Sequence, residues 1–176
     1  MNLLITLLVF FLISFSGFAQ NKVNWISWNK AVTASAENPK MIFVDTYTDW
    51  CGWCKKMDAS TFSDPVISKY MNENYYSVKM DAEMKDTIDF NGYQFVNPNP
   101  NGRRSTHQLA ASLLDNKLSY PSFVILTPKF ERMQILPGYK SAKDFEPIIR
   151  YFVEGASQGA EFEEYMKNFS SLYTQN

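Results

Sequence analysis

Two stretches of the chain are continuous runs of apolar and β-branched residues, without regular alternation of apolar and polar positions. They are "KMIFVDTYT" (Lys40–Thr48) and "YYSVKMD" (Tyr75–Asp81), and both have the length of a strand. Such runs are typical of strands buried on both faces, in the middle of a sheet covered by helices. We therefore predict two central strands here, with a short edge strand at Val23–Ile26.

Helical patterns separate these strands. Ser27 is placed to cap a helix that ends at Asn38-Pro39. A second helix is expected to begin at the cysteine pair Cys51/Cys54. A new helical piece is expected to begin at Pro65, because proline suits the first helical position.

The second half of the chain predicts a hairpin, a helix, an antiparallel strand pair and two final helices. Asn91-Gly92 lies between aromatic-rich arms and indicates a type I′ turn, which needs positive φ at both central residues. Ser105 with Gln108 forms a capping-box pattern for a third main helix through Leu114. The remaining predicted elements are strands at Ser122–Thr127 and Arg132–Tyr139, a helix opened by Ser141 and Asp144 that ends near Gly155, and a helix over Glu161–Leu172. This order predicts an α/β fold with a mixed sheet flanked by helices.

The first nineteen residues indicate export. "MNLLITLLVFFLISFSGFA" has no charged side chain, and its apolar stretch is short for a membrane span. Gly17 and Ala19 are small residues before an expected cleavage ahead of Gln20. We predict a signal peptide at 1–19, one domain at 20–176 and a periplasmic or secreted location. An uncleaved membrane anchor is the alternative, because no Lys or Arg precedes the apolar run.

Charge and composition narrow the class of partner. The formal net charge is −1 and no basic stripe is present, so we expect no nucleic-acid binding. No flavin or nicotinamide site is visible, so we expect no such cofactor. After signal cleavage we expect no membrane contact, and we expect a monomer.

Cys51 and Cys54 are the only cysteines, in "TDWCGWCKKM". As a structural staple, so small a ring would constrain the unfolded chain by only about 2 kcal/mol. A structural zinc site normally takes four Cys or His ligands. The only histidine, His107, is distant in sequence and is expected to be solvated, although carboxylates such as Asp49 keep the metal hypothesis open. We favour redox chemistry and predict no metal, because the N–H groups and dipole at a helix N terminus stabilise a thiolate.

The redox hypothesis gives each residue a role. Cys51, at the helix tip, would be the attacking thiolate, and the more buried Cys54 would resolve the mixed disulfide. Asp45 lies in an otherwise apolar strand, where a carboxylate is costly unless it has a task or a partner. We expect it to be buried with a raised pKa and to accept the proton of Cys54. An edge strand with Asp45 facing water is the alternative.

These residues resemble the thioredoxin superfamily. "VDTYTDWCGWCKKM" is similar to its active-site segment, with Asp45 six residues before Cys51, as the family's buried Asp is. "YPSFVIL" (Tyr120–Leu126) resembles the family's cis-proline strand opening, which implies that Pro121 is cis and lies beside the disulfide. "TFSDPVISKYMNENYYSVKMDAE" is similar to a subgroup of exported bacterial thioredoxin-like domains. The resemblance covers about Trp25 to Phe152 and implies a thioredoxin-like fold.

Three features depart from the family pattern. Gly52-Trp53 stands between the cysteines where thioredoxin itself has Gly-Pro, so the reduction potential cannot be carried over. The hairpin-bearing segment Glu83–Arg104 is an insertion before the third main helix. The helix after Gly155 is an addition.

The resemblance implies a thiol:disulfide oxidoreductase that exchanges disulfides with protein substrates, without a cofactor other than the Cys51–Cys54 disulfide itself. Its partners would be protein thiols or disulfides and an upstream thiol protein that supplies electrons. The expected substrate-binding residues are Trp50, Gly52, Trp53, Tyr120 and Pro121, the tryptophans as an apolar rim. The alternative is a non-catalytic binding module of the same fold with a structural disulfide. Reductase, oxidase and isomerase would use the same residues, so the direction of electron flow stays open.

Overall fold

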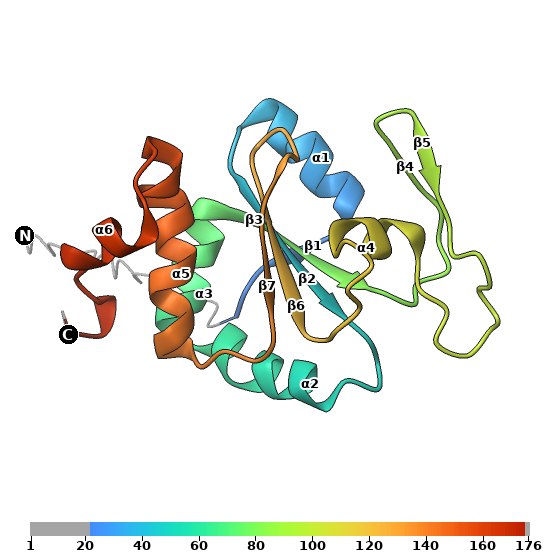
Figure 1. Ribbon diagram of the computed structural model, residues 1–176, viewed down its shortest axis with the longest axis horizontal. Coiled ribbons are helices and arrows are strands. Elements are labelled where there is room, and N and C mark those ends of the chain that lie inside the picture. The colour runs from blue at the N-terminus through green and yellow to red at the C-terminus, as the bar shows by residue number, and fades with distance from the viewer. Residues whose placement is uncertain (1–21, 175–176) are drawn as a thin grey trace, which may run out of the picture.

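A computed structural model describes residues 22–174 (Figure 1). The predicted signal peptide therefore lies outside the described residues. The strands are β1 (Trp25–Ile26), β2 (Met41–Tyr47), β3 (Tyr75–Asp81), β4 (Ile88–Phe90), β5 (Tyr93–Phe95), β6 (Ser122–Leu126) and β7 (Arg132–Pro137). The α-helices are α1 (Trp28–Glu37), α2 (Gly52–Ala59), α3 (Pro65–Asn74), α4 (Gln108–Leu113), α5 (Ala142–Glu154) and α6 (Phe162–Lys167). Within this part of the chain, no helix has the length and apolarity needed to span a membrane.

Five strands form one mixed sheet in the order β1-β3-β2-β6-β7. β1, β3 and β2 run parallel, whereas β6 is antiparallel to β2 and β7 is antiparallel to β6. The two predicted central strands are neighbours, and β2 is buried along almost its whole length. The predicted mixed sheet flanked by helices is confirmed.

Helices cover both faces of the sheet and create two cores (Figure 1). One core, under α1 and α4, contains apolar residues that include Val44, Val78 and Val124. The other, under α2, α3 and α5, is rich in aromatic rings and has Phe43 stacked on Phe123 at 5.5 Å. Successive residues of β2 thus face opposite cores, as strand geometry requires.

Side-chain caps explain where several helices begin. Ser27 accepts a hydrogen bond from the Lys30 amide at the start of α1, and Ser141 does the same for the Asp144 amide at the start of α5. Asp64 caps α3, with Pro65 in its first turn. These starts agree with the sequence prediction because the capping residue types satisfy otherwise unpaired N–H groups.

The segment Glu83–Arg104 carries a separate two-stranded hairpin, β4 and β5, which stands outside the main sheet (Figure 1). Asn91 and Gly92 have φ of 51° and 78°, as a type I′ turn needs. Asn97 holds the loop that follows. Its side-chain amide donates to carbonyl oxygens of Glu83, Met84 and Ser105 at 2.8–3.3 Å.

The predicted Ser105/Gln108 capping box is wrong. The Ser105 hydroxyl donates to Asn97 Oδ1 at 2.6 Å, and the Gln108 side chain accepts from the Val96 amide at 3.0 Å. His107 caps α4 instead, with Nδ1 accepting from the Leu109 amide. The two polar side chains that would have formed the capping box therefore form hydrogen bonds with residues of the insertion instead.

His107 is also fully buried and not solvated. Its Nε2 lies 3.1 Å from the carbonyl oxygen of Asp86, and burial lowers the pKa of the ring.

At the C terminus, α6 is shorter than predicted. Beyond it, a buried carboxylate of α5, Glu146, accepts hydrogen bonds from the Leu172 amide and the Ser171 hydroxyl.

Candidate redox site

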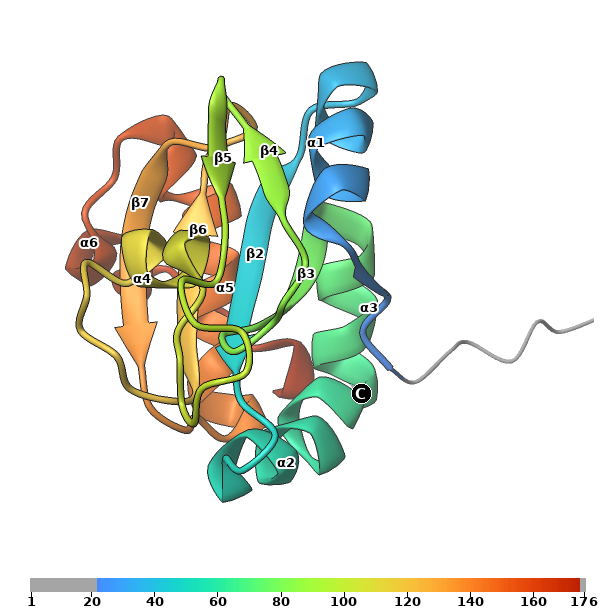
Figure 2. The ribbon, with the colours of Figure 1, turned by 90° about the vertical axis from the view of Figure 1, so that its right-hand side faces the viewer.

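Cys51 and Cys54 form a disulfide where β2 leads into α2 (Figure 2). The S–S bond is 2.03 Å and the two Cα atoms are 5.3 Å apart. Cys51 is the N-cap residue of α2, and its Sγ accepts a hydrogen bond from the Cys54 amide at 3.1 Å. The first sulfur therefore lies among the unpaired donors of a helix N terminus, the environment that stabilises a thiolate.

Cys54 is more buried than Cys51, as predicted, but the difference is small. Cys51 has an exposed fraction of 5% and Cys54 of 2%. The Cys51 amide donates to the Thr48 carbonyl oxygen at 3.0 Å, which folds the loop back against the end of β2. In the disulfide form, both cysteines are thus buried.

Asp45 lies on β2 with an exposed fraction of 1%, so the alternative of a solvent-facing Asp45 is wrong. Parallel pairing places it opposite Lys79 of β3, whose Nζ is 2.6 Å from Asp45 Oδ2. Burial raises the pKa of Asp45 to about 6, because the opposing effect of the lysine is smaller. The expected buried carboxylate of raised pKa is present.

Lys79 links this carboxylate to α2. Its Nζ also binds Asp58, which lies one turn after Cys54. The rings of Trp25, Tyr47 and Phe62 surround the ammonium group at 4.8–5.4 Å. Burial lowers the pKa of Lys79, but the two carboxylates outweigh burial and raise it.

Sequence reasoning missed Lys79 and Asp58. The available signal was that Asp45 and Lys79 are charged residues at the same position, the fifth, of the two largely apolar strands β2 and β3. Parallel strands in register bring such residues together. The other oxygen of Asp45, Oδ1, is buried and has no hydrogen-bond partner among the described residues, so it is an available proton acceptor.

Two exposed tryptophans flank Cys51 in the sequence. Trp50 has an exposed fraction of 52% and packs edge-on against Tyr120 at 5.9 Å. Trp53 has an exposed fraction of 56% and lies 5.4 Å from Tyr139. Between them, Gly52 is exposed, and a Cβ placed on it would meet only open space. The chain thus presents an exposed aromatic ring immediately before Cys51 and another between the two cysteines.

Pro121 precedes β6, and the Tyr120–Pro121 peptide bond is cis, as the family resemblance implied. The pairing of Thr46 with Ser122 places Pro121 next to the end of β2, where the loop to the cysteines begins. Pro121 is buried, and its carbonyl oxygen accepts from the Gly138 amide at 2.8 Å.

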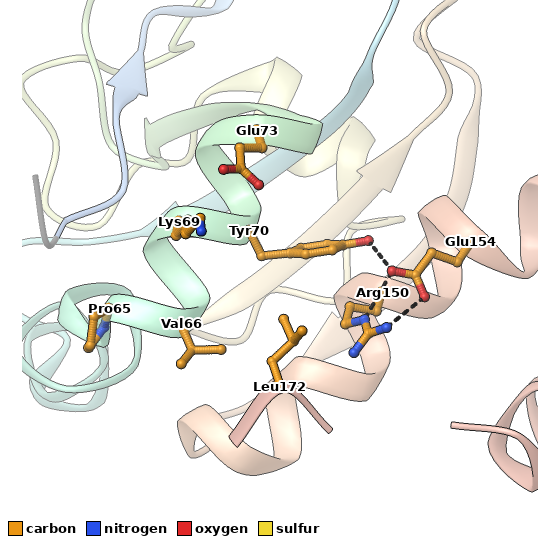
Figure 3. Close-up of a pocket in the computed structure, with 8 residues that line it drawn as sticks. All are labelled: Pro65, Val66, Lys69, Tyr70, Glu73, Arg150, Glu154 and Leu172. Carbon is orange, nitrogen blue, oxygen red and sulfur yellow. Dashed lines mark hydrogen bonds and ion pairs between the residues drawn. The ribbon is translucent and has the colours of Figure 1, made fainter. Parts of the chain in front are cut away.

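Residues 22–174 contain no group of three or more His, Cys, Asp or Glu side chains arranged to hold a metal ion. A pocket of about 520 Å³ lies elsewhere, between α3 and α5 (Figure 3). There, Glu154 accepts hydrogen bonds from Tyr70 and Arg150, and Lys69 and Glu73 add two further charged side chains.

Comparisons with known proteins show the family to which the chain belongs. A family model, Thioredox_DsbH, described as "Protein of unknown function, DUF255", matches residues 11–135. Spermatogenesis-associated protein 20 of Rattus norvegicus is 31% identical over 85 residues, which are 48% of this chain and 11% of that protein. The thiol:disulfide interchange protein DsbD of Pectobacterium atrosepticum is 38% identical over 40 residues, 23% of this chain and 7% of that protein.

The chain therefore spans about a tenth or less of the length of these curated relatives. Among solved structures, one titled DsbH oxidoreductase superposes with a TM-score of 0.57 at 14% identity, covering 82% of this chain and 93% of that one. At this identity the likeness shows the thioredoxin fold.

Proposed function

Because this chain belongs to the Thioredox_DsbH family of thioredoxin-fold proteins, we propose that it is an exported enzyme that exchanges disulfides with protein substrates. At a coarse level, the fold and the Cys51–Cys54 disulfide are those of a thiol:disulfide oxidoreductase. The placement of Cys51 as the N-cap of α2 is the single observation that carries the proposal of catalysis. A cap sulfur that accepts an N–H hydrogen bond is set to exist as a thiolate once the disulfide is reduced.

The reduced enzyme acts in two exchanges. First, the Cys51 thiolate attacks one sulfur of the substrate disulfide, a mixed disulfide forms, and the other substrate sulfur leaves as a thiolate that takes up a proton. Second, the Cys54 thiolate attacks the Cys51 sulfur, and the second substrate thiol is released. The substrate gains two electrons and two protons, and the Cys51–Cys54 disulfide forms.

Asp45 assists the second exchange. Cys54 is the more buried cysteine and must lose its proton to attack. A carboxylate with a pKa of about 6 is a base matched to neutral pH. Its ion pair with Lys79, which also binds Asp58 of α2, ties it to the helix that carries both cysteines. The proton would reach it directly or through one water.

The rim residues Trp50, Gly52, Trp53, Tyr120 and Pro121 would hold the substrate chain beside Cys51. Aromatic faces provide apolar contact area, and an extended substrate segment could pair with backbone next to Pro121. We place the protein in the periplasm or outside the cell, as a monomer, with an upstream thiol protein that restores the dithiol.

Insulin reduction in the presence of dithiothreitol tests this function. We expect the wild type to accelerate precipitation of the insulin B chain, and Cys51→Ser to lose the acceleration entirely. Cys54→Ser, the matched variant, should instead accumulate a mixed disulfide with insulin. A Cys51→Ser variant with full activity would refute the assignment.

The burial of both cysteines favours one alternative, a thioredoxin-fold binding module whose disulfide stays closed. Equilibration with glutathione separates the two functions. A cysteine pair that exchanges disulfides would reach equilibrium with glutathione. Its reduction potential would be about −270 mV for a reductase or about −120 mV for an oxidant. A disulfide that resists glutathione, with no effect on insulin, would favour the binding module.

A further inference from the structure

Each exposed tryptophan beside the disulfide carries a positively charged side chain on its ring. The Arg104 guanidinium lies 4.9 Å from the ring centre of Trp50. Lys56 Nζ lies 4.7 Å from the ring centre of Trp53 and 5.1 Å from that of Tyr139. Two separate elements, the end of the insertion and α2, therefore each place a cation on an exposed tryptophan close to Cys51 in sequence.

The insertion holds Arg104 at this position. Arg104 has a φ of 57°, a backbone conformation that few non-glycine residues adopt. The surrounding loop must therefore hold the backbone of Arg104 in this conformation. The next residue, Ser105, is fastened to Asn97 by both its hydroxyl and its carbonyl oxygen. At the other end of the insertion, Glu83 accepts a hydrogen bond from Trp50 Nε1 at 3.1 Å. Both ends of the insertion thus meet at one tryptophan of the candidate site.

Both cations are available to a partner. Arg104 and Lys56 are exposed, and neither forms an ion pair with the residues that the structure describes. Three acids, Asp49, Asp81 and Glu83, lie near Trp50 and Tyr120. Asp81 is half-buried, and its carboxylate accepts a hydrogen bond from the Glu83 amide at 2.9 Å. Asp49, beside Trp50, is exposed, whereas Glu83 is half-buried and bonded to the indole. The exposed Lys55 adds a further positive charge on α2.

We propose that this cationic rim, formed by one cluster of Trp50, Tyr120 and Arg104 and a second cluster of Trp53, Tyr139 and Lys56, binds an acidic segment of the partner protein next to its target disulfide. The inference rests on the proposed function and names the chemistry of its substrate. Rings contact the apolar parts of the segment, and the cations stacked on them face its carboxylates. Such complementarity acts mainly on association rate and specificity, and salt screens it.

Two synthetic peptides test the proposal. Each contains one intramolecular disulfide, and they differ only in carrying glutamate or lysine at the positions flanking the cysteines. With the reduced protein as reductant, we expect kcat/KM to be about tenfold higher for the acidic peptide at low ionic strength. The ratio should approach one at about 1 M salt, where the Debye length is about 3 Å. Equal rates, or faster reduction of the basic peptide, would overturn the proposal.

Charge-removing variants locate the effect. Arg104→Gln and Lys56→Gln should each lower kcat/KM for the acidic peptide about two- to threefold while raising it for the basic peptide. Simple structural damage would lower both. Arg103→Gln removes an exposed neighbouring charge that has no cation–π contact or ion pair among the described residues, and it should leave the ratio unchanged. Rim variants that behave like Arg103→Gln would overturn the proposal.

The proposed function can fail separately. If the wild type reduced neither the peptides nor insulin, the catalytic proposal would be wrong. The rim is then judged by fluorescence anisotropy of the two labelled peptides on the same protein. Tighter binding of the acidic peptide would support the rim, and equal affinities would overturn it.

Discussion

At the scale of single residues, Asp45 is governed by two opposing influences. Burial favours its neutral form, whereas the ion pair with Lys79 favours the carboxylate. Burial is the larger influence, and it raises the pKa of Asp45 to about 6. Lys79 therefore tunes the acidity of the proposed base without touching the substrate, which makes it a positioning residue.

Replacing Lys79 with methionine should move the pH dependence of turnover. Without the ammonium group, the main influence that lowers the pKa of Asp45 is lost, and burial raises this pKa further. We expect insulin reduction at about pH 6.5 to fall roughly five- to tenfold, with much smaller loss at about pH 8.5. Lys69→Met, on α3, is the control. A profile with the same midpoint as the wild type would show that Lys79 does not tune Asp45.

Several residues of the candidate site could be predicted from the sequence because short spacings carry them. The Cys-x-x-Cys pair, Asp45 six positions earlier and Pro121 ahead of a strand are each visible in one segment. Lys79 and Asp58 were not found, because their role depends on strand register and on which helix packs over β2. Those are long-range properties that no local pattern contains.

At the scale of elements, the insertion Glu83–Arg104 is the segment that sequence reasoning resolved least. Asn91-Gly92 predicted its hairpin correctly because the turn requires positive φ. The loop after the hairpin depends on one buried amide, Asn97, whose partners lie 8 to 14 positions away in sequence. The failed capping-box prediction has the same cause, since Ser105 bonds to Asn97 and not to the helix.

Asn97→Ala should release the insertion without unfolding the domain. The substitution removes the donors to three carbonyl oxygens and the acceptor for Ser105, a loss of about 2–3 kcal/mol of local stability. We expect limited trypsin digestion to cut at Arg103 or Arg104 at least tenfold faster, as followed by mass spectrometry. Asn101→Ala, in the same loop but exposed, is the matched control. Equal cleavage rates for the two variants would contradict this role of Asn97.

At the scale of the whole molecule, the fold was largely predictable. Two strands buried on both faces required helices on both sides of a sheet, and β2 and β3 are its central parallel pair. The structure of the C-terminal segment was less predictable from the sequence. The helix α6 ends at Lys167, and Glu146 of α5 forms hydrogen bonds with residues 171 and 172 beyond it. A helical repeat of aromatic residues cannot reveal such a contact.

The buried carboxylate lowers the stability of the whole domain at neutral pH. The pKa of Asp45 is higher in the folded state, about 6, than its ordinary value of 3.8. The folded state therefore binds this proton more tightly than the unfolded state. The resulting stability is fully present below about pH 3.8 and is lost as pH rises through about 6.

Asp45→Asn should remove this pH dependence. From about pH 4 to pH 8, we expect the free energy of unfolding of the oxidised variant to gain about 2–3 kcal/mol relative to the wild type. Urea denaturation at several pH values measures the difference, with the exposed hairpin acid variant Asp89→Asn as control. Parallel curves for Asp45→Asn and the wild type would mean that Asp45 titrates normally in the folded protein.

Trapping of the mixed disulfide tests the division of labour between the two sulfurs most directly. Reduced Cys51→Ser and Cys54→Ser proteins are each incubated with a disulfide substrate, and the adduct is located by mass spectrometry. We predict that Cys54→Ser accumulates a substrate adduct on Cys51 and that Cys51→Ser forms at least tenfold less adduct on Cys54. Equal adducts on the two cysteines, or a preference for Cys54, would contradict the account.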